Sequence, residues 1–310
     1  MKVTQNYTPK VACIIPTYND IDSLKRCLAS LREQKNIDFK VIIVDSSSLD
    51  GTAEYASRYA DIFVSIQSSD FNHGGTRQMI AELYDDFEIL VFLTQDAYLD
   101  KPDSLLRIIN PFTDNNVSAV CGRQLPHVNA TVLSQHARYF NYPNETLVKA
   151  ASDIRNLGLK TPFLSNSFSA YRRSTLISTG GFPSNVILSE DMYIGAKMIL
   201  CGFKIVYAAD ATCYHSHNYS LLEEFKRYFD IGVFHAREDW IRKNFGGAGG
   251  EGLKYVKSEI KFLWPNNIHL IPESFLRNAL KLIAYKLGQL ENKLPNNLKR
   301  KLSMHKGFWL

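Results

Sequence analysis

Four short apolar runs alternate with helix-like segments in the first hundred residues of this chain. The runs occupy residues 11–15, 41–44, 62–66 and 89–93, and they are rich in Val, Ile and Leu without polar alternation. Strands of this composition are covered on both faces, as in a parallel sheet whose crossovers are helices. The pattern therefore predicts an α/β domain built on a mostly parallel sheet with helices on both faces.

The second half of the chain is less regular. Residues 117–121, 163–171 and 203–208 are predicted strands, and residues 190–201 are a predicted helix. From residue 221 onward the apolar spacing is helical, interrupted by a glycine-rich stretch and by prolines. We therefore expect a helical extension behind the α/β part.

Composition narrows the class of protein. The 310 residues are 45% hydrophobic and 22% charged, as in ordinary globular chains. There is no run of 18 apolar residues and no apolar segment near the N-terminus, so we expect neither a spanning helix nor a secretory signal. The five cysteines lack CxxC spacing, which argues against a zinc finger or a disulfide framework and fits a reduced cytosol.

The positive charge is concentrated at the end of the chain. Residues 252–310 contain 11 Lys and Arg against 3 Glu, an excess of +8, whereas the rest of the chain carries −3. Such a basic segment indicates either a solvated surface or contact with an anionic partner, which would be nucleic acid or a phospholipid surface. Phe275, Ala279, Leu282 and Ile283 recur at helical spacing. This spacing favours a helix that lies on a membrane.

Carboxylates follow two of the predicted strands, where ligands bind in open α/β sheets. Asp45 ends the second strand and is a candidate for binding a pyrimidine or a ribose, although capping of the next helix explains it equally well. Pro16, Thr17 and Tyr18 end the first strand and are candidates for contacts to the same base. Asp96 ends the fourth strand and is a candidate ligand for a divalent cation held with a diphosphate.

Histidines follow the strand at residues 203–208. His215 or His217 could reach the same metal or diphosphate. Strand alternation places the two on opposite faces, so we expect at most one of them to do so.

A pair of acids begins the helix predicted at residues 190–201. Glu190 or Asp191 is a candidate general base, although the helix dipole alone favours acids there and also lowers their basicity. Gly74 and Arg77 lie in a glycine loop at the start of a predicted helix. The loop could bind a phosphate through its backbone and Arg77, or it could simply connect a strand to a helix.

Other enzyme classes fit the sequence less well. A dinucleotide-binding oxidoreductase needs GxGxxG after the first strand, where this chain has PTYN. A sugar-phosphate nucleotidyltransferase needs its glycine-rich phosphate loop there, whereas the glycine loop of this chain follows the third strand. A nucleic-acid-binding protein that uses the basic segment remains an alternative.

The ordered motifs resemble the family 2 glycosyltransferases of GT-A fold, and within them the bacterial O-antigen rhamnosyltransferases. The resemblance extends from about residue 11 to residue 264. It rests on IPTYN (15–19), VD (44–45), DGT (50–52), DFNHGGTR (70–77), FLTQDA (92–97), CGRQLPH (121–127), SNSF (165–168), SEDM (189–192), HSHNY (215–219) and FGGAGGEG (245–252).

The resemblance implies an inverting transfer of L-rhamnose from dTDP-L-rhamnose to a saccharide, with galactose expected, on a polyprenyl (undecaprenyl) diphosphate. It implies that Asp45 binds base and ribose, that Asp191 is the catalytic base, and that Asp96 with His215 holds Mg²⁺ or Mn²⁺. Gln95, which precedes Asp96 in the same motif, is expected to contact the nucleotide. Thr94 replaces the first acid of the family's DxD motif, so the metal site has one carboxylate fewer.

The same resemblance implies an organisation and a location. We expect a GT-A catalytic domain over residues 1–220, with a donor half at 1–125 and an acceptor half at 126–220. Residues 221–310 are expected to form a basic, mainly helical membrane-associating region. The enzyme would act as a peripheral protein at the cytoplasmic face of the bacterial inner membrane, with no nucleic-acid partner. Another nucleotide sugar remains an alternative donor.

Overall fold

The first half of the chain forms a parallel sheet with the strand order β3-β2-β1-β4. The computed structural model describes residues 8–247 and 250–309. The strands and their connecting helices are β1 (Val11–Thr17), α1 (Ile21–Arg32), β2 (Phe39–Asp45), α2 (Thr52–Tyr59), β3 (Ile62–Ser65), α3 (His73–Leu83) and β4 (Ile89–Leu93). The α/β expectation for this half is confirmed.

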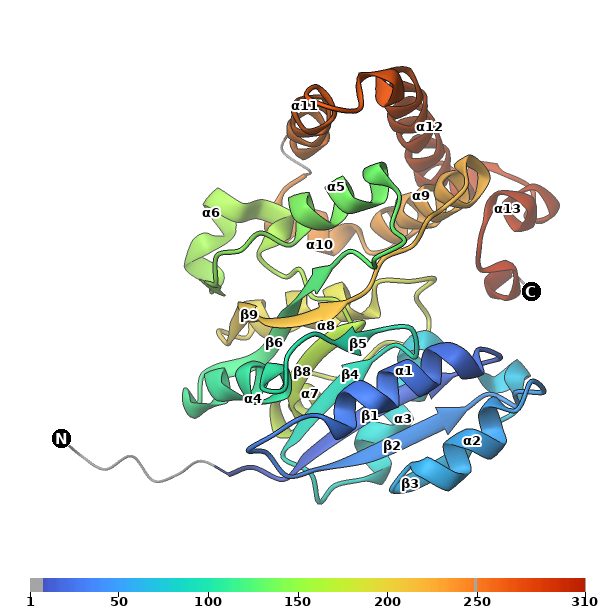
Figure 1. The fold of residues 1–310 in the computed structure, drawn as a ribbon. Helices are drawn as coiled ribbons and strands as arrows, with labels where there is room; N and C mark the ends of the chain where they lie inside the picture. The colour runs from blue at the N-terminus through green and yellow to red at the C-terminus, as the bar shows by residue number, and fades with distance from the viewer. Residues whose placement is uncertain (1–7, 248–249, 310) are drawn as a thin grey trace.

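Two apolar cores lie on opposite faces of these strands. Ile14 and Ile42 pack with Ile80 of α3 on one face, whereas Cys13 and Ile43 pack with Leu24 of α1 on the other. Both faces are therefore covered by helices (Figure 1). This two-sided burial is the reason why the strands lack polar alternation.

Strand β1 is longer than its apolar run predicts. It continues through Pro16 and Thr17, which pair with Val44 and Asp45 of β2. The pairing of β1 with β4 has already ended at Ile14, so the missing N–H of Pro16 breaks no ladder on that side. The extension brings Thr17 directly beside Asp45.

The second half makes the sheet mixed. Strands β6 (Val117–Leu125) and β9 (Lys204–Tyr214) are parallel, whereas β8 (Phe168–Arg172) runs antiparallel between β4 and β6. Short strands β5 (Tyr98–Leu99) and β7 (Leu147–Lys149) pair antiparallel with β9. The predicted strand at 163–171 begins only at Phe168, because residues 163–167 form a loop that runs into the site described below.

Helices cover this half of the sheet and complete the chain. The helices between β5 and β9 are α4 (Ser104–Ile109), α5 (Val132–Asn141), α6 (Ile154–Leu157), α7 (Arg173–Ser178) and α8 (Glu190–Leu200). The predicted helical extension consists of α9 (Leu221–Arg237), α10 (Asp239–Phe245), α11 (Glu251–Leu263), α12 (Ile271–Gln289) and α13 (Asn296–Leu302). No helix in the described part of the chain is long and apolar enough to cross a membrane.

The helical extension shares its core with the sheet. Phe229 and Val233 of α9 and the C-terminal Trp309 are buried in the same apolar cluster as Ile14 and Ile42. Helix α12 then packs along α9, and α11 and α12 together lie at the end of the molecule opposite β1–β3 (Figure 1). We call α11, α12 and their connection, residues 251–289, the terminal hairpin.

Two glycines fix the crossing of α9 and α12. A Cβ on Gly232 would collide with the carbonyl oxygen of Tyr285, and a Cβ on Gly288 would collide with the carbonyl oxygen of Phe229. The two helix backbones therefore touch, which any other residue would prevent.

Candidate active site

The loop after β2 is organised around Asp45. This buried carboxylate accepts hydrogen bonds from the Thr17 hydroxyl at 2.9 Å, the Ser48 amide at 2.8 Å and the Ser48 hydroxyl at 2.6 Å. Asp45 thus stabilises the turn after β2, but it does not cap α2, whose N-cap residue is Gly51. Contact of Asp45 with a nucleoside stays a prediction.

The end of β1 is tied to the end of β4. The Gln95 side chain accepts from the Tyr18 amide at 2.8 Å and donates to the Tyr18 carbonyl at 3.0 Å. This reciprocal pair leaves the Tyr18 ring 54% exposed beside the Asp45 loop. Pro16, Thr17, Tyr18 and Gln95 therefore lie together, at the edge where the sequence predicted a nucleotide.

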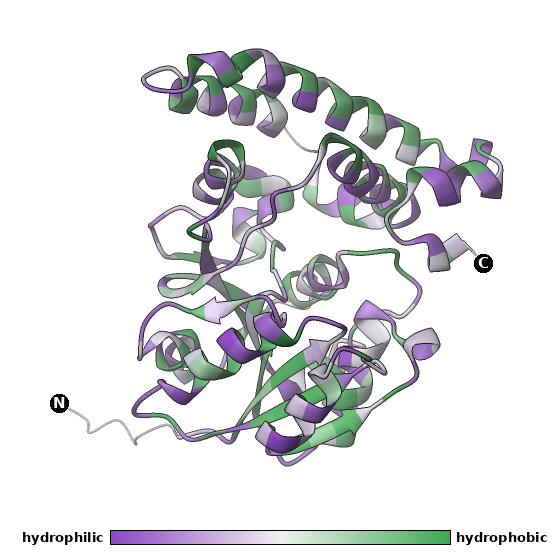
Figure 2. Cartoon of the chain, turned by 45° about the vertical axis from the view of Figure 1, so that its right-hand side comes forward, coloured by the Kyte–Doolittle hydropathy of each residue, from purple (hydrophilic) through white to green (hydrophobic). Residues whose placement is uncertain are grey.

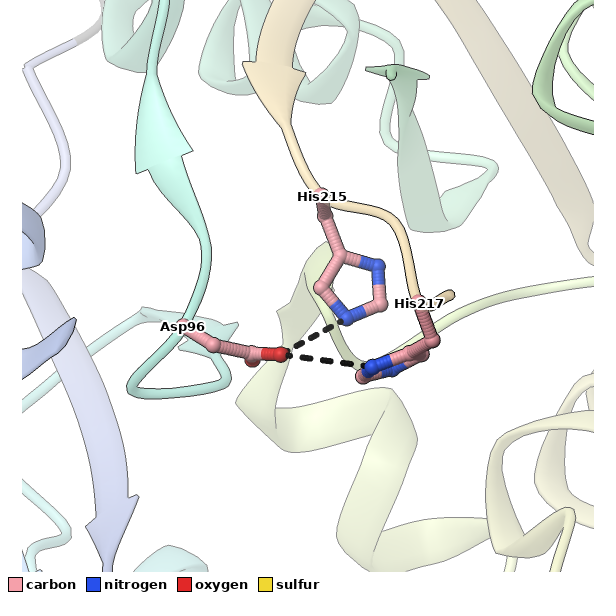
Figure 3. A group of neighbouring side chains, drawn as sticks. All are labelled: Asp96, His215 and His217. Carbon is pink, nitrogen blue, oxygen red and sulfur yellow. Dashed lines mark ion pairs between the residues drawn. The ribbon is translucent and has the colours of Figure 1, made fainter. Parts of the chain in front are cut away.

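Asp96 and two histidines form a candidate metal centre. His215 Nε2 lies 3.5 Å and His217 Nδ1 3.8 Å from Asp96 Oδ2, and the three ligand atoms lie within 4.8 Å of one another (Figure 3). The expectation that only one histidine reaches the site is wrong. Strand β9 ends at Tyr214, so the alternation of a strand does not extend to His215 and His217.

The protonation of this cluster suits a cation. Burial and the neighbouring His215 lower the pKa of His217 to about 4, which leaves its imidazole neutral. Burial favours the protonated form of Asp96, but the hydrogen bond and charge of His215 outweigh it and lower the pKa of Asp96. His215 Nδ1 lies 2.9 Å from Gln124 Oε1, a contact that directs its Nε2 at Asp96. One carboxylate and two imidazoles are a donor set for a divalent cation.

Asp191 lies in the first turn of α8, where main-chain amides orient it. Its carboxylate accepts from the Asn166 amide at 3.0 Å and from the Met192 amide at 2.7 Å. Burial and the negative charge of Glu190 raise the pKa of Asp191 to about 7. The sequence left open whether the helix dipole makes this acid a poor base. Burial and Glu190 decide in favour of a basic carboxylate.

Glu190 has a different role from its neighbour. It is buried, forms an ion pair with Arg77 at 3.0 Å, and accepts from the Asn166 side chain at 3.0 Å. Although burial opposes ionisation, the Arg77 charge lowers the pKa of Glu190. The pKa of Asp191 is thus raised and that of the adjacent Glu190 is lowered, which is the pattern of paired acids in acid–base catalytic sites.

Gly74 and Arg77 lie in the first turns of α3, and contact of either residue with a phosphate stays a prediction. Arg77 is buried against Glu190 and also donates to the His73 carbonyl at 2.8 Å, and it lies in the lining of the cavity described below. Gly74 packs against the backbone of Pro183, where a Cβ would collide. Arg77 thus holds Glu190 at the start of α8, and Gly74 lets α3 approach the Pro183 backbone.

The metal cluster and the Glu190–Asp191 pair line one cavity of about 520 Å³, whereas the donor-edge residues Pro16, Thr17, Tyr18, Asp45 and Gln95 do not. Asp96, Asp191, His215 and His217 contribute to it from the sheet and α8. Its wall also includes residues of α5, α9 and the terminal hairpin: Arg138, Arg227, Tyr228, Tyr255, Glu259, Arg277 and Lys281. The sequence did not single out these wall residues as site residues, because which side chains of distant helices meet at one cavity depends on tertiary packing.

Arg227 and His305 are further residues of the wall that the sequence missed. Arg227 is exposed and, in residues 8–247 and 250–309, makes no ion pair; it lies over the Tyr219 ring at 5.9 Å. His305 stacks edge-on against His73 with ring centroids 5.3 Å apart. Burial and the charges of His73 and Arg227 lower the pKa of His305 to about 4. The last turn of the chain thus returns to the cavity.

Comparison with known proteins identifies the class of this site. Residues 12–180 match glycosyl transferase family 2. The O-antigen chain rhamnosyltransferase WbaN of Salmonella anatum is 48% identical over 97% of this chain and 96% of its own length. The O-antigen chain rhamnosyltransferase RfbN of Salmonella typhimurium is 47% identical over 97% of this chain and 96% of its own.

Solved structures support the fold independently. A mannosyltransferase of Pyrobaculum calidifontis, solved with GDP-Man and Mn²⁺, superimposes with a TM-score of 0.65 at 20% identity and covers 93% of this chain and 89% of its own. At that identity the likeness concerns the fold, which is GT-A. With the family match and the two relatives, it shows that the chain is a glycosyltransferase of family 2 and belongs with the O-antigen chain rhamnosyltransferases.

Proposed function

We propose that the chain transfers L-rhamnose from dTDP-L-rhamnose to a polyprenyl-diphosphate-linked saccharide during O-antigen synthesis, with galactose as the accepting sugar. The two relatives that align over nearly the whole chain support rhamnosyl transfer. The observation that carries the chemistry is the shared cavity, which joins a basic carboxylate, Asp191, to the Asp96–His215–His217 cluster. The reaction takes place at the cytoplasmic face of the bacterial inner membrane.

The donor nucleotide occupies the edge formed by β1, β2 and β4. The exposed Tyr18 ring offers a stacking surface for thymine, and the Asp45 loop offers polar groups to the ribose. The residues of the metal cluster fit Mg²⁺ or Mn²⁺, and a bound cation would supply Lewis-acid neutralisation of the leaving diphosphate. Arg227 adds a permanent positive charge on the same cavity.

Asp191 acts as the general base. The acceptor hydroxyl gives its proton to an Asp191 carboxylate oxygen while its oxygen attacks the anomeric carbon of rhamnose. The bond from that carbon to the β-phosphate oxygen of dTDP breaks, so the configuration inverts. A base with a pKa of about 7 is ionised enough to accept this proton and basic enough to hold it.

Product analysis tests the proposal. The protein is incubated with dTDP-L-rhamnose, or with a panel of other nucleotide sugars, and a lipid-linked galactose acceptor. We expect transfer from dTDP-L-rhamnose alone, with an anomeric configuration opposite to that of the donor. Preferred transfer from another nucleotide sugar, or retention of configuration, would refute it.

A further inference from the structure

Helix α12 has its polar and apolar faces reversed relative to an ordinary surface helix. Phe275, Leu276, Leu282 and Ile283 are 53%, 50%, 60% and 51% exposed. Globular helices normally bury such a stripe and expose their charges. In α12 the exposed stripe recurs at helical spacing, and the described part of the chain does not cover it. Figure 2 shows hydrophobic segments along the helices at the end of the molecule opposite the sheet.

The charged face of α12 points into the protein. Arg277 and Lys281 are largely buried, and both pair with Glu224 of α9, at 3.1 and 2.7 Å. One helical turn away, Ser274 and Asn278 donate to the buried Glu259 of α11. Buried charges are costly unless they are paired, so this polar interior serves more than packing. Arg277, Lys281 and Glu259 line the cavity that contains Asp191.

The rest of the terminal hairpin continues the outer surface. Leu253, Trp264 and Ile268 are 61%, 65% and 57% exposed. Lys257 and Lys261 of α11 and Lys286 of α12 are also exposed, and none of the three forms an ion pair with another described residue. Exposed Trp, Phe and Leu together with lysines are the composition of a helix that lies in a bilayer interface. The lysines favour anionic headgroups over a neutral protein partner.

We propose that the outer face of the terminal hairpin docks on an anionic lipid bilayer, while its inner face receives the polar end of the lipid-linked acceptor. This inference rests on the proposed function for the identity of the acceptor. In this arrangement the hairpin lies between the apolar interior of the bilayer and the cavity, and one layer of helices separates the two. An acceptor held in the bilayer by its polyprenyl chain therefore presents its saccharide at the wall that leads to Asp191.

Vesicle flotation of the full-length protein tests the docking surface. The variant Leu282→Glu/Ile283→Glu changes two exposed side chains, and the control Leu83→Glu/Leu200→Glu adds the same charge at exposed apolar sites 60% and 44% accessible outside the hairpin. On vesicles with phosphatidylglycerol, we expect the hairpin variant to lose more than about tenfold in partitioning, because it removes apolar contact and adds negative charge. The control should bind as the wild type does.

The lysines give a second, independent variant. Lys257→Glu/Lys261→Glu should weaken binding to anionic vesicles by about fivefold or more per lysine, and should change binding to phosphatidylcholine vesicles little. Equal flotation of wild type and both hairpin variants would overturn the proposal. So would a concentration-dependent dimer that the hairpin substitutions abolish, because the occupant would then be a second copy of the chain.

Kinetics separate this inference from the proposed function. With a water-soluble acceptor that has a short alkyl chain, the hairpin variants should keep wild-type turnover; with a polyprenyl-linked acceptor in vesicles, they should lose about tenfold or more in kcat/KM. Loss with both acceptors would refute the docking role. Absence of rhamnosyl transfer by the wild type would refute the proposed function and would leave the flotation result intact.

Discussion

Replacement of Asp191 by Asn tests the assignment of the general base with little change in shape. Asn keeps the volume of the carboxyl group, and its side-chain oxygen can still accept from one of the two amides, of Asn166 or Met192, that orient Asp191. It cannot take the acceptor's proton. The variant therefore removes the proposed chemistry and leaves the walls of the cavity in place.

The expected loss of turnover follows from the role of Asp191 as general base. A positioned general base typically contributes about 10²–10⁴ in rate, so kcat of Asp191→Asn should fall by that factor, with the affinity for dTDP-L-rhamnose nearly unchanged. In the wild type, kcat should rise with pH and level off above about 7, because Asp191 must be ionised and its pKa is raised to about 7. The residual activity of the variant should lack this rise.

The stability of the folded protein should fall as the pH rises, whereas kcat should increase. The folded state raises the pKa of Asp191 from 3.8 to about 7, so it binds this proton more tightly than the unfolded chain, and ionisation above pH 4 destabilises the fold. At about 1.4 kcal/mol per pKa unit, this cost is on the order of 4 kcal/mol at pH 8. Asn avoids it but leaves one amide unpaired, at about 1–3 kcal/mol. The variant should therefore melt no lower than the wild type at pH 8.

Three measurements check this reasoning: kcat against pH with both proteins, donor binding by calorimetry, and thermal melting at pH 5 and pH 8. Turnover of Asp191→Asn within about threefold of the wild type would remove Asp191 from the role of base, since even the low end of general-base catalysis is about 10². Loss of donor binding, or a strongly lowered melting temperature at pH 8, would show that the residue holds the structure instead.

Three further perturbations address the rest of the site. Asp96→Ala should weaken dTDP binding in the presence of Mg²⁺. Calorimetry with and without chelator should show that the affinity of the variant no longer depends on metal. Equal affinities of the wild type with and without chelator would contradict the metal assignment. Arg227→Ala should lower dTDP affinity by about 10–100-fold through one lost charge-assisted contact and should affect thymidine little, whereas the neighbouring Lys226→Ala should bind both normally. Gly288→Val should destabilise the protein by at least about 1–3 kcal/mol in denaturant titration because its side chain would collide with the α9 backbone; Gly252→Ala, which has open space, is the control.

The strands and the donor edge could be predicted because their signals are local. A continuous apolar run followed by a polar residue defines a buried strand and its end, and this placed Asp45 and Asp96 at one edge. The same logic failed for His215 and His217, since nothing in the sequence shows that β9 ends at Tyr214. It also did not reveal the ion pair of Arg77, because its partner Glu190 lies more than a hundred residues away in the chain.

The wall of the cavity could not be predicted, since it depends on how distant helices pack. Arg227 and Lys281 belong to amphipathic helices whose pattern gives a polar face but not what that face meets. The exposed stripe of α12 was visible as Phe275, Ala279, Leu282 and Ile283. Periodicity gives an apolar face but not what covers it, and only the structure shows that Phe275, Leu282 and Ile283 are exposed.

The glycine crossing of α9 and α12 holds the terminal hairpin rigidly against α9. Gly232 and Gly288 meet backbone to backbone, so no side-chain rotamer can absorb a shift of α12 at that point. The same helix α9 carries Arg227 little more than one turn before Gly232, with its side chain on the cavity. The ion pairs of Arg277 and Lys281 with Glu224 join the same two helices on the cavity side. We therefore expect the hairpin and the part of the cavity wall that carries Arg227 to move as one body.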